Sequence, residues 1–547
     1  ITFGTTATGS ASTIQNVQIR YAGQGNAAAL YINQSTLEVS NTQVLNSLYQ
    51  GIYLRETTST LSAVEISGAG NHGIYLSSAN ATLDTLVIRD VADSGIYAYL
   101  GAPSILNSDI QGADNGIFVQ YATPTLQGNT LQNNRGWGLY FYSTTDTPPI
   151  VGNTISNNLR GARIPASAFP LPDGSNTFIP NTLSPLAILG NTRNNDLPLT
   201  VLSDGQGNTL STYHFIGDTT LASDATLSVD PGVTLKFDPN AQLRANGTAL
   251  LLGTKAAPIT LTSVYDDSVS GDFGGDGYAK GPQAGDWDGI YLPSNPSADP
   301  SSLQNVRIRY AGQLGAALFI DRQGPVSMND VEVSASSTYG LRARNSGTAL
   351  DITGLQAFSN ADDGLILESS TSATLSGSRF FANGDDGIQV TSATLELSAS
   401  ELFANAGLGL ESNTAVQAQG NWWGATDGPS GEGRAGSGDA ISSTVDISGF
   451  MGVGDDFLDD GTEFSYFDAG PNTHSGTLPA PDVLSGTTSS QFGDTPGETI
   501  LFDPEAISLA FTGLDPDQGY SLLRTALNED ETSAKGGNIQ HLEDGDA

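Results

Sequence analysis

Short apolar segments that each open with a glycine recur along the first third of the chain. The segment Gly-Ile-Tyr-Leu at 51–54 returns, with small changes, at 73–76, 95–98, 116–119 and 138–141, so its spacing is nearly constant. Runs of β-branched, aromatic and leucine side chains are typical of short strands, and a glycine before the strand suits a tight turn. A period this short and steady indicates one small unit stacked on copies of itself.

A second group of apolar residues lies between these segments in every unit. These residues come in closely spaced sets flanked by Gly, Asn and Ser, as in Leu61, Val64 and Ile66. Two or three short strands per repeat, joined by turn residues, are the pattern of a β-solenoid coil of about 22 residues. We therefore predict an all-β chain of coils that pair in parallel, about 4.8 Å apart, around a column of inward apolar side chains.

The repeats fall into two related arrays. Residues 14–32 (IQNVQIRYAGQGNAAALYI) match residues 303–320 (LQNVRIRYAGQLGAALFI), so we predict two tandem modules, 1–210 and 211–450. The first module ends in a proline-rich excursion at 165–210, and the second contains an Asp/Gly-rich insertion at 266–288. Because proline cannot donate a hydrogen bond to a strand ladder, we expect the excursion to be rich in loops.

The two ends of the chain follow different patterns. The chain starts inside a repeat, which suggests a fragment of a longer precursor. Beyond residue 450 the period is lost, and the acidic residues there predict a linker at 451–475. Alternating apolar and polar residues in 476–547 predict a C-terminal β-rich segment, which looks like an incomplete small β-domain.

Asparagines recur at equivalent turn positions of neighbouring units. Asn129 and Asn153 form one such pair, and Asn134 and Asn158 form another. Asn tolerates the left-handed backbone conformation and can hydrogen-bond to the same residue one coil away. We expect these residues to form turn ladders rather than a binding site.

Charge and composition narrow the possible partners. The chain has 58 Asp and Glu against 20 Lys and Arg, a net charge of −38, which argues against nucleic acid as a partner and suits an extracellular surface or divalent cations. No apolar run is long enough for a transmembrane segment, and no signal peptide opens the chain. Cysteine is absent, which a large stacked core tolerates and which leaves the compartment open.

Four kinds of motif can be compared with known families. They are the Gly-Ile-Tyr-Leu units, the paired segments Asn-Thr-Leu-Gln-Asn-Asn at 129–134 and Asn-Thr-Ile-Ser-Asn-Asn at 153–158, Asn-Trp-Trp-Gly at 421–424, and Gly-Asp-Trp-Asp-Gly-Ile at 285–290. Together they resemble bacterial right-handed parallel β-helix repeat proteins of the large secreted or surface-exposed type, over about residues 1–450. The resemblance implies a right-handed parallel β-helix and an extracellular or cell-surface location. It implies no activity, because the same fold hosts pectin and alginate lyases, glycosidases, tailspikes and inert spacers.

Two acidic pairs are the best candidates for a carboxylate site. Asp362 and Asp363 precede one strand-opening glycine, and Asp385 and Asp386 precede the glycine of the next repeat, so we expect the pairs to be adjacent in space. A glycosidase needs two carboxylates about 5–9.5 Å apart. Stacked acidic turns without a function are the simpler interpretation. If the residues act together, bound Ca²⁺ is favoured over catalysis because it relieves the repulsion of like charges.

The Asp/Gly-rich insertion is a second candidate for a metal site. Its carboxylates, spaced by glycine and serine, are Asp266, Asp267, Asp272 and Asp276. Carboxylate oxygens on a flexible backbone suit Ca²⁺, although the segment matches neither an EF-hand loop nor a repeated glycine-rich calcium motif. A solvated loop is the alternative.

The second array ends at Trp422 and Trp423. The terminal repeat of a solenoid needs a cover over its apolar column, so we interpret this pair as a structural cap. The alternative is an aromatic platform for a sugar ring.

Residues with catalytic chemistry do not converge in the sequence. The four His residues are isolated, without metal or triad spacing, and no nucleotide-binding motif is present. A lyase for acidic polysaccharides needs cations beside its base, whereas this chain has four Lys and scattered Arg residues. The residues favour a non-enzymatic role without an organic cofactor, and Ca²⁺ is the cofactor to consider.

Two functional hypotheses follow. The first is a structural or adhesive surface protein, a rigid β-helix rod or fibre subunit, with Ca²⁺ as a candidate stabiliser. Its partners would be copies of itself joined end to end, other surface components, or polysaccharide. The second is a polysaccharide-binding or polysaccharide-degrading protein, with a groove of carboxylates and aromatic residues such as Tyr97, Tyr99, Tyr140 and Tyr142.

Overall fold

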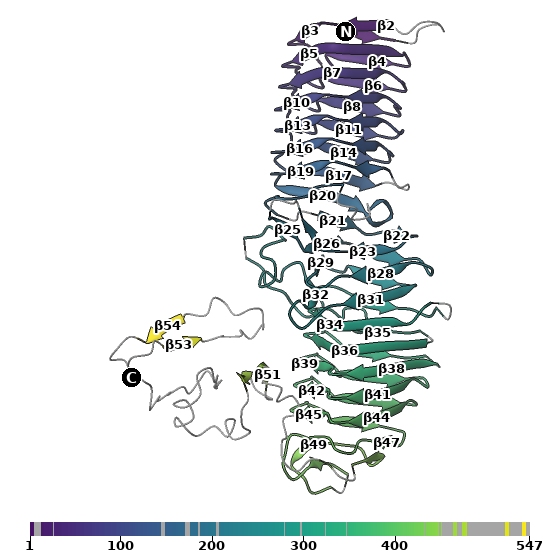
Figure 1. The fold of residues 1–547 in the computed structure, drawn as a ribbon, viewed down its shortest axis with the longest axis vertical. Coiled ribbons are helices and arrows are strands. Elements are labelled where there is room, and N and C mark those ends of the chain that lie inside the picture. The colour runs from purple at the N-terminus through teal and green to yellow at the C-terminus, as the bar shows by residue number, and fades with distance from the viewer. Residues whose placement is uncertain are drawn as a thin grey trace. The chain divides into compact units, whose positions relative to one another are not determined.

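The structure is a computed structural model whose regular secondary structure is almost entirely β-strand (Figure 1). It describes residues 1–450 except 5–11, 26, 144–147, 170–174, 184–185, 204–206, 278, 296–297, 323, 346, 433 and 448–449, together with four short strands beyond residue 450. Contacts divide the chain into unit 1 (1–236 with 272–277) and unit 2 (237–271 with 278–547). In the described residues the one helix is the 3-10 turn η1 (Ala166–Ala168).

The coils of unit 1 carry strands on three sides, and the glycine-opened segments form the first side, called face 1. Each strand of face 1 pairs in parallel with the strand of the next coil, so that Ile52 lies beside Ile74 and Tyr53 beside Tyr75. The strands are β1 (Thr2–Phe3), β4 (Leu30–Asn33), β6 (Ile52–Arg55), β8 (Ile74–Ser77), β11 (Ile96–Tyr99), β14 (Ile117–Gln120), β17 (Trp137–Ser143), β20 (Arg160–Pro165), β21 (Leu186–Leu189) and β26 (Thr212–Ile216). The predicted all-β solenoid with parallel coils is confirmed.

The other two sides of unit 1 differ between early and later coils. In the first coil two separate strands cover faces 2 and 3, but in the next two coils one long strand bends from face 2 into face 3. A left-handed residue marks the bend, Asn41 (φ 45°) in β5 and Ala63 (φ 50°) in β7. In later coils this strand is split in two. The strands are β2 (Ser12–Gln15), β3 (Gln18–Arg20), β5 (Leu37–Leu45) and β7 (Thr60–Ser67), then β9 (Thr82–Asp84), β12 (Ser104–Leu106), β15 (Thr125–Gln127) and β18 (Ile150–Val151) on face 2, and β10 (Val87–Arg89), β13 (Asp109–Gln111), β16 (Thr130–Gln132) and β19 (Thr154–Ser156) on face 3.

Strand pairing continues through the proline-rich segment 165–210. Strand β21 pairs with β20, and Pro198 lies within β23 opposite Ser228 of β28. The remaining strands of this region are β22 (Thr192–Arg193), β23 (Leu197–Leu199), β24 (Leu202–Ser203), β25 (Thr209–Leu210), β27 (Thr219–Leu221), β28 (Thr226–Val229) and β29 (Thr234–Phe237). The segment therefore contributes strands to the coil stack as well as loops.

Unit 2 repeats the three-sided plan. Its face 1, which contains the Gly-Ile-Tyr-Leu segment at 289–292, consists of β30 (Gln242–Ala245), β33 (Gly289–Leu292), β35 (Leu318–Ile320), β37 (Leu341–Ala343), β40 (Leu365–Glu368), β43 (Ile388–Thr391) and β46 (Leu410–Ser412). Its other faces consist of β31 (Thr248–Leu252), β32 (Ile259–Ser263), β34 (Ser301–Arg309), β36 (Gly324–Ser334), β38 (Thr348–Thr353), β39 (Gln356–Phe358), β41 (Ser372–Ser376), β42 (Arg379–Phe381), β44 (Thr394–Ser398), β45 (Glu401–Phe403), β47 (Val416–Gln417) and β50 (Val445–Asp446). The short pair β48 (Pro429–Ser430) and β49 (Gly438–Ala440) follows the last full coil.

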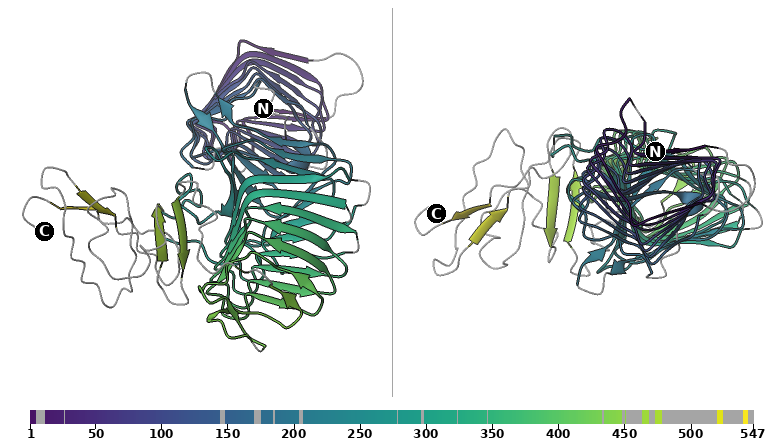
Figure 2. Two further views of the ribbon diagram at one scale, coloured as in Figure 1. Left: turned by 60° about the horizontal axis from the view of Figure 1, so that its bottom comes forward. Right: turned by 90° about the horizontal axis from the view of Figure 1, so that it is seen from above.

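Inward side chains of successive coils form the core. Ile52 and Leu54 of β6 and Ile74 and Leu76 of β8 have no exposed surface, while the residues between them are half-buried. In the right-hand view of Figure 2 the coils of unit 1 lie nearly on top of one another around a common interior. Burial of each Leu or Ile side chain contributes about 1.5–3 kcal/mol, so the stacked coils are stabilised mainly by this column.

The predicted asparagine ladders are confirmed. The backbone N–H and Nδ2 of Asn129 both donate to Oδ1 of Asn153, each over 3.0 Å. Asn134 donates in the same way to Oδ1 of Asn158, over 3.0 and 2.9 Å. A third ladder, in unit 2, runs through Asn360, Asn383, Asn405 and Asp439. These side chains satisfy backbone groups inside the turns, where unpaired polar groups are costly.

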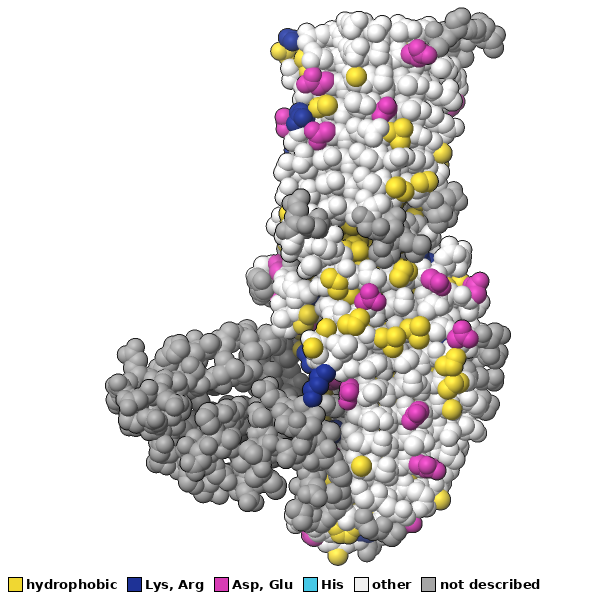
Figure 3. Space-filling view, viewed as in Figure 1, with side chains coloured by type: hydrophobic (Ala, Val, Ile, Leu, Met, Phe, Trp, Pro, Cys, Tyr) yellow, Lys and Arg dark blue, Asp and Glu magenta, His cyan; other side chains and the backbone are white. Residues whose placement is uncertain are grey.

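Charged side chains are sparse on the outer surface. On the face that Figure 3 draws, Asp and Glu lie mostly singly among uncharged side chains, in keeping with a chain in which 14% of residues are charged. The described part of the chain contains no helix of the length and hydrophobicity that a bilayer crossing requires.

Beyond residue 450 the structure describes two antiparallel strand pairs. Strand β51 (Glu463–Phe467) pairs with β52 (Thr473–Thr477), and β53 (Tyr520–Leu523) pairs with β54 (Ile539–Leu542). Apart from these strands, the predicted acidic linker (451–475) and the predicted C-terminal β-rich segment (476–547) lie outside the described residues.

Candidate functional site

The two acidic pairs of unit 2 lie in consecutive turns that precede face 1. Asp362 and Asp363 follow β39 and precede β40, whereas Asp385 and Asp386 follow β42 and precede β43. Since Leu365 of β40 lies beside Ile388 of β43, the two turns are stacked. We call these four residues the acidic turn cluster.

Three of the four carboxylates converge. Asp362, Asp363 and Asp385 each offer a carboxylate oxygen, and these oxygens all lie within 4.8 Å of one another. Asp363 is buried and Asp385 is exposed, so the group opens to solvent on one side. Asp386 is buried and is held by the next coil.

The buried members of the cluster each accept a backbone hydrogen bond from the following coil. The N–H of Asp386 donates to Oδ1 of Asp363 over 2.9 Å, and the N–H of Leu408 donates to Oδ1 of Asp386 over 2.6 Å. Gly407 makes room for these carboxylates, because a Cβ there would lie 2.4 Å from Oδ1 of both Asp385 and Asp386. A side chain at position 407 would therefore displace the cluster.

Burial and repulsion make the two buried carboxyl groups, Asp363 and Asp386, hard to ionise. Burial, together with repulsion from the carboxylates of Asp386, Asp362 and Asp385, raises the pKa of Asp363 to about 7, against the N–H bond that Asp363 accepts. Burial likewise raises the pKa of Asp386 to about 6, with added repulsion from Asp385 and Glu411. At neutral pH the site therefore carries negative charge that it stabilises poorly.

This geometry suits a cation better than glycoside hydrolysis. Two oxygens on one Ca²⁺, each about 2.4 Å from the ion, can be at most about 4.8 Å apart, and the three oxygens meet that limit. The acid and base of a glycosidase are separated by about 5–9.5 Å so that a sugar or water fits between them. The donors are all carboxylate oxygens, which are hard ligands of the kind that Ca²⁺ prefers.

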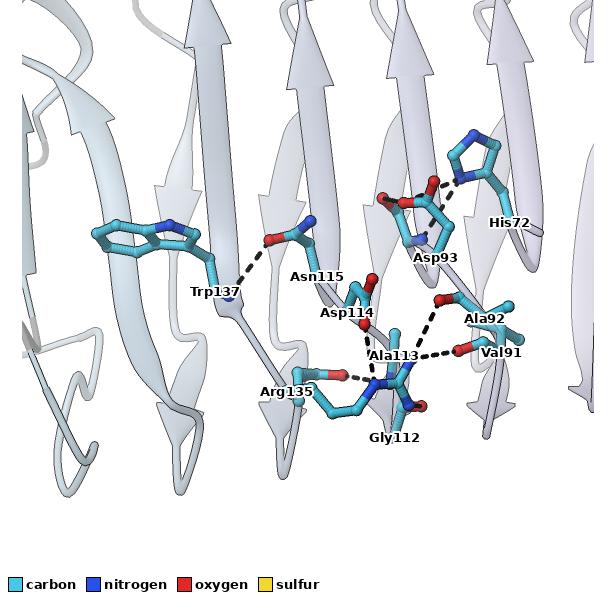
Figure 4. Close-up of polar contacts among 12 residues, drawn as sticks. His72, Val91, Ala92, Asp93, Gly112, Ala113, Asp114, Asn115, Arg135 and Trp137 are labelled. Carbon is cyan, nitrogen blue, oxygen red and sulfur yellow. Dashed lines mark hydrogen bonds and ion pairs between the residues drawn. The ribbon is translucent and has the colours of Figure 1, made fainter. Parts of the chain in front are cut away.

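In unit 1 the same turn contains other residue types with the same hydrogen-bond role. Figure 4 shows that the side chain before the strand-opening glycine accepts an N–H from the equivalent position of the next coil. The N–H of Ser94 donates to Nδ1 of His72 over 3.4 Å, and the N–H of Trp137 donates to Oδ1 of Asn115 over 3.2 Å. An acceptor at this position is thus a structural feature of several coils, whether it is an imidazole, an amide or a carboxylate.

His72, Asp93 and Ser94 are close together but do not form a catalytic triad. Nδ1 of His72 lies 3.7 Å from Oδ1 of Asp93 and accepts the backbone N–H of Ser94. The hydroxyl of Ser94 is buried and donates to Asp93 over 3.0 Å instead of facing the imidazole. Burial lowers the pKa of His72, an effect that the Asp93 carboxylate opposes in part. A nucleophile needs its base within hydrogen-bond reach, and this arrangement lacks that contact.

Arg135 links three successive turns of unit 1. Its Nε donates to Asp114 over 2.9 Å, and its other nitrogens donate to the carbonyl oxygens of Gly112, Val91 and Ala92 over 2.7 to 3.1 Å (Figure 4). The guanidinium group is therefore used within the turns.

The Asp/Gly-rich insertion uses two of its carboxylates in hydrogen bonds within the chain. In unit 2, Asp266 is buried and accepts the Thr262 hydroxyl over 2.6 Å. In unit 1, Asp272 accepts backbone N–H groups from Gly275, Asp276 and Gly277. Burial alone would raise the pKa of Asp272, but these three donors lower it below its ordinary value. A metal at Asp266, Asp267, Asp272 and Asp276 stays a prediction.

The two tryptophans at the end of the second array have different environments. Trp423 is fully buried, and its Nε1 has no hydrogen-bond partner in the described part of the chain. Trp422 is half-buried, and its carbonyl oxygen accepts the N–H of Leu402. Strand β50 pairs with β47, so chain beyond the tryptophans adds to the end of the stack. A capping role for Trp422 and Trp423 stays a prediction.

Sequence reasoning missed the contact of His72 with the turn of the next coil. Considered alone, His72 looked isolated, but Ser94 lies 22 residues further on and therefore at the same position of the next coil. Adding the repeat length to each polar turn residue would have found the contact.

The stacked turns and parallel three-sided coils define the class of protein, a parallel β-solenoid. A family model described as "right handed beta helix region" matches residues 27–183 and 288–423, more than half of the chain, and the chain therefore belongs to this right-handed β-helix family. No curated protein and no solved structure matches the chain.

Proposed function

We propose that this β-helix protein is a structural and adhesive protein of the bacterial cell surface or extracellular space. Its supporting observation is that polar turn side chains are bonded to the next coil. His72, Asn115, Asp363 and Asp386 all accept backbone N–H groups, and the asparagine ladders do the same. Side chains used in this way stabilise the stack and are not poised for a reaction.

We also propose that Ca²⁺ stabilises the acidic turn cluster. Three carboxylate oxygens within 4.8 Å of one another fit one ion, and the ion would relieve the repulsion that raises the pKa of Asp363. Bound Ca²⁺ would join two consecutive coils, because Asp362 and Asp385 belong to different coils.

Adhesion requires a partner, and we propose polysaccharide or another surface component, with end-to-end association of copies as a further mode. Parallel coils add in one direction only, so copies would join head to tail, as in other heterologous contacts. Electron microscopy of the purified chain separates single particles from filaments.

The proposal is tested by incubating the full chain with a panel of neutral and acidic polysaccharides, with Ca²⁺ or with a chelator. We expect retention of at least one polysaccharide and no change in its chain length, measured by affinity electrophoresis and size-exclusion chromatography. Shortening of any polymer would contradict the proposal and support a polysaccharide-degrading enzyme. The absence of binding to every polymer would remove polysaccharide as the partner.

A further inference from the structure

An uncharged, aromatic surface covers part of face 1 in unit 1. Strands β8, β11, β14 and β17 contain no charged residue. We call their outward side chains, with the corner residue after β14, the aromatic face. It consists of Tyr75, Ser77, Tyr97, Tyr99, Phe118, Gln120, Tyr121, Tyr140 and Tyr142. The chain as a whole has a net charge of −38, and the absence of charged residues from these four strands distinguishes the aromatic face from it.

The inner rings of the aromatic face are stacked on one another. Ring centroids lie 5.2 Å apart for Tyr75 and Tyr97, 4.9 Å for Tyr97 and Phe118, and 4.8 Å for Phe118 and Tyr140. The rings of Tyr97, Phe118 and Tyr140 lie nearly parallel and cover one another's faces, whereas Tyr75 is tilted by 42° against Tyr97. This column therefore presents mainly ring edges and hydroxyl groups to solvent. The ring faces inside this column are covered by neighbouring rings, so they do not offer a surface on which a sugar ring could stack.

The outer rings are less enclosed. Tyr121 and Tyr142 are each 50% exposed. Tyr121 meets Tyr99 edge to face at 6.2 Å, and Tyr142 lies 6.5 Å from Phe118. Aromatic rings with exposed surface and a hydroxyl group combine apolar contact with hydrogen bonding. Such an apolar patch with a polar rim is typical of an interaction site.

The charges around this surface select among possible partners. Recognition of carboxylate, sulfate or phosphate groups needs Arg or Lys. Within face 1 the nearest strands that carry arginine are β6 and β20, and Arg163 of β20 already stacks on Tyr140 at 4.8 Å and donates to its hydroxyl oxygen. An acidic polymer would therefore lose its hydration here without gaining a cation, whereas a neutral sugar presents C–H faces and hydroxyl groups.

We propose that the aromatic face binds a neutral polysaccharide. The repeat favours a polymer, since equivalent outward positions recur once per coil along β8, β11 and β14, as in the aligned pairs Tyr75–Tyr97 and Tyr97–Phe118. This inference rests on the proposed adhesive function and names the chemistry of its partner. It differs from the predicted groove of carboxylates and aromatic residues, because the four strands contribute aromatic residues without carboxylates.

The test compares the wild-type chain with the double variant Tyr121→Ser/Tyr142→Ser. The matched control is Tyr21→Ser, because Tyr21 is also an exposed tyrosine with a positive φ (52°, against 55° for Tyr121) and lies outside the aromatic face. Soluble probes are hydroxyethyl cellulose, mannan and starch as neutral polymers, and alginate and polygalacturonate as acidic ones. Binding is measured by affinity electrophoresis at low and high salt, and folding of each variant by circular dichroism.

We expect the wild type to bind a neutral polymer with little dependence on salt, and the double variant to bind it roughly tenfold more weakly. Tyr21→Ser should bind as the wild type does. Preference for an acidic polymer would overturn the inference, as would a double variant that binds neutral polymer normally. Wild-type protein that binds no polysaccharide would instead contradict polysaccharide as the partner in the proposed adhesive function, on which this inference rests. Loss of dimers in the double variant on sedimentation would overturn the inference by identifying the face as a contact between copies.

Discussion

The residue before the strand-opening glycine has the same structural role in several coils of this protein. It accepts an N–H from the next coil, and imidazole, amide and carboxylate groups perform that task at His72, Asn115 and Asp363. The chemical cost differs between these groups. A neutral amide can be buried with its hydrogen bonds, but a carboxylate must either bind a proton, pair with a cation or remain a destabilising charge.

This cost predicts a pH-dependent stability in the absence of divalent cations. The pKa of Asp363 is about 7 in the folded protein against an ordinary value of 3.8, so the folded state binds more protons between these values. Stability should therefore fall as pH rises from about 4 to about 7 and then level off. Asp363→Asn keeps an oxygen for the Asp386 N–H and removes the charge. In chelator at pH 8 it should be more stable than the wild type by roughly 2–4 kcal/mol, and at pH 4 nearly equal to it.

Denaturant unfolding at several pH values measures this effect. Asp351→Asn, an exposed carboxylate of β38 outside the cluster, is the control and should follow the wild-type profile. A variant Asp363→Asn that is less stable than the wild type at pH 8 in chelator would show that the charged form is favoured in the fold.

At the scale of elements, ladders of one residue type join neighbouring coils. Asn153 shows how many hydrogen bonds one residue of a ladder makes. It accepts two from Asn129 and donates to the carbonyl oxygen of Leu126 and to Oδ1 of Asn176. Removal of one member leaves buried donors and acceptors in both adjacent turns without partners.

We expect Asn153→Ala to destabilise unit 1 by about 2–5 kcal/mol, because at least two buried backbone groups lose their hydrogen bonds. Thr154→Ala, at the exposed neighbouring position of β19, should change stability by less than about 0.5 kcal/mol. Chemical denaturation of both variants gives the comparison. Equal midpoints would mean that water replaces the asparagine side chain.

The repeat in the sequence was enough to predict the strands, the parallel coils and the asparagine ladders. A period of about 22 residues with inward Ile and Leu leaves little choice of fold. It did not predict that β5 and β7 bend through a left-handed residue, because Asn41 and Ala63 resemble ordinary turn residues. Nor did it predict strand pairing at Pro198, since a proline without an N–H still fits where its neighbours do not need that donor.

The site was predicted less completely than the fold. Because the two acidic pairs are one repeat apart, the sequence placed them in adjacent turns, as the structure has them. It did not distinguish Asp363, which is buried and points along the stack, from Asp385, which is exposed, because the pattern of polar residues alone does not tell the direction of a turn side chain. The stacking of face 1 aromatic rings was missed for a related reason. Alternation identifies outward residues but not how they pack against one another.

At the scale of the whole molecule, the two stretches that the family model matches fall in different contact units. The matched residues 27–183 lie in unit 1, and the matched residues 288–423 lie in unit 2. The acidic turn cluster belongs to unit 2, so a cation bound there should act on one unit and leave the other unchanged.

Hydrogen exchange with and without Ca²⁺ tests this expectation. Ligand at 100 times its Kd stabilises the folded state by about 2.7 kcal/mol, and peptides that contain β40 and β43 should exchange more slowly. Peptides that contain β8 in unit 1 should not change. Asp362→Asn/Asp385→Asn removes two of the three ligands and should abolish the effect. Equal slowing in both units, or slowing in the double variant, would place the ion elsewhere.

Because the coils resemble one another, their shared apolar residues do not determine which coils pair, whereas the residues that break the repeat do. If one coil were shifted along the stack by a full repeat, most of its Leu and Ile side chains would still pack against Leu and Ile side chains. Hydrophobic burial alone therefore tolerates such a misalignment. The odd members do not: Asp439 ends a ladder of asparagines, and Trp137 follows Asn115 where other coils of unit 1 have small or polar residues. Such residues determine which coil pairs with which.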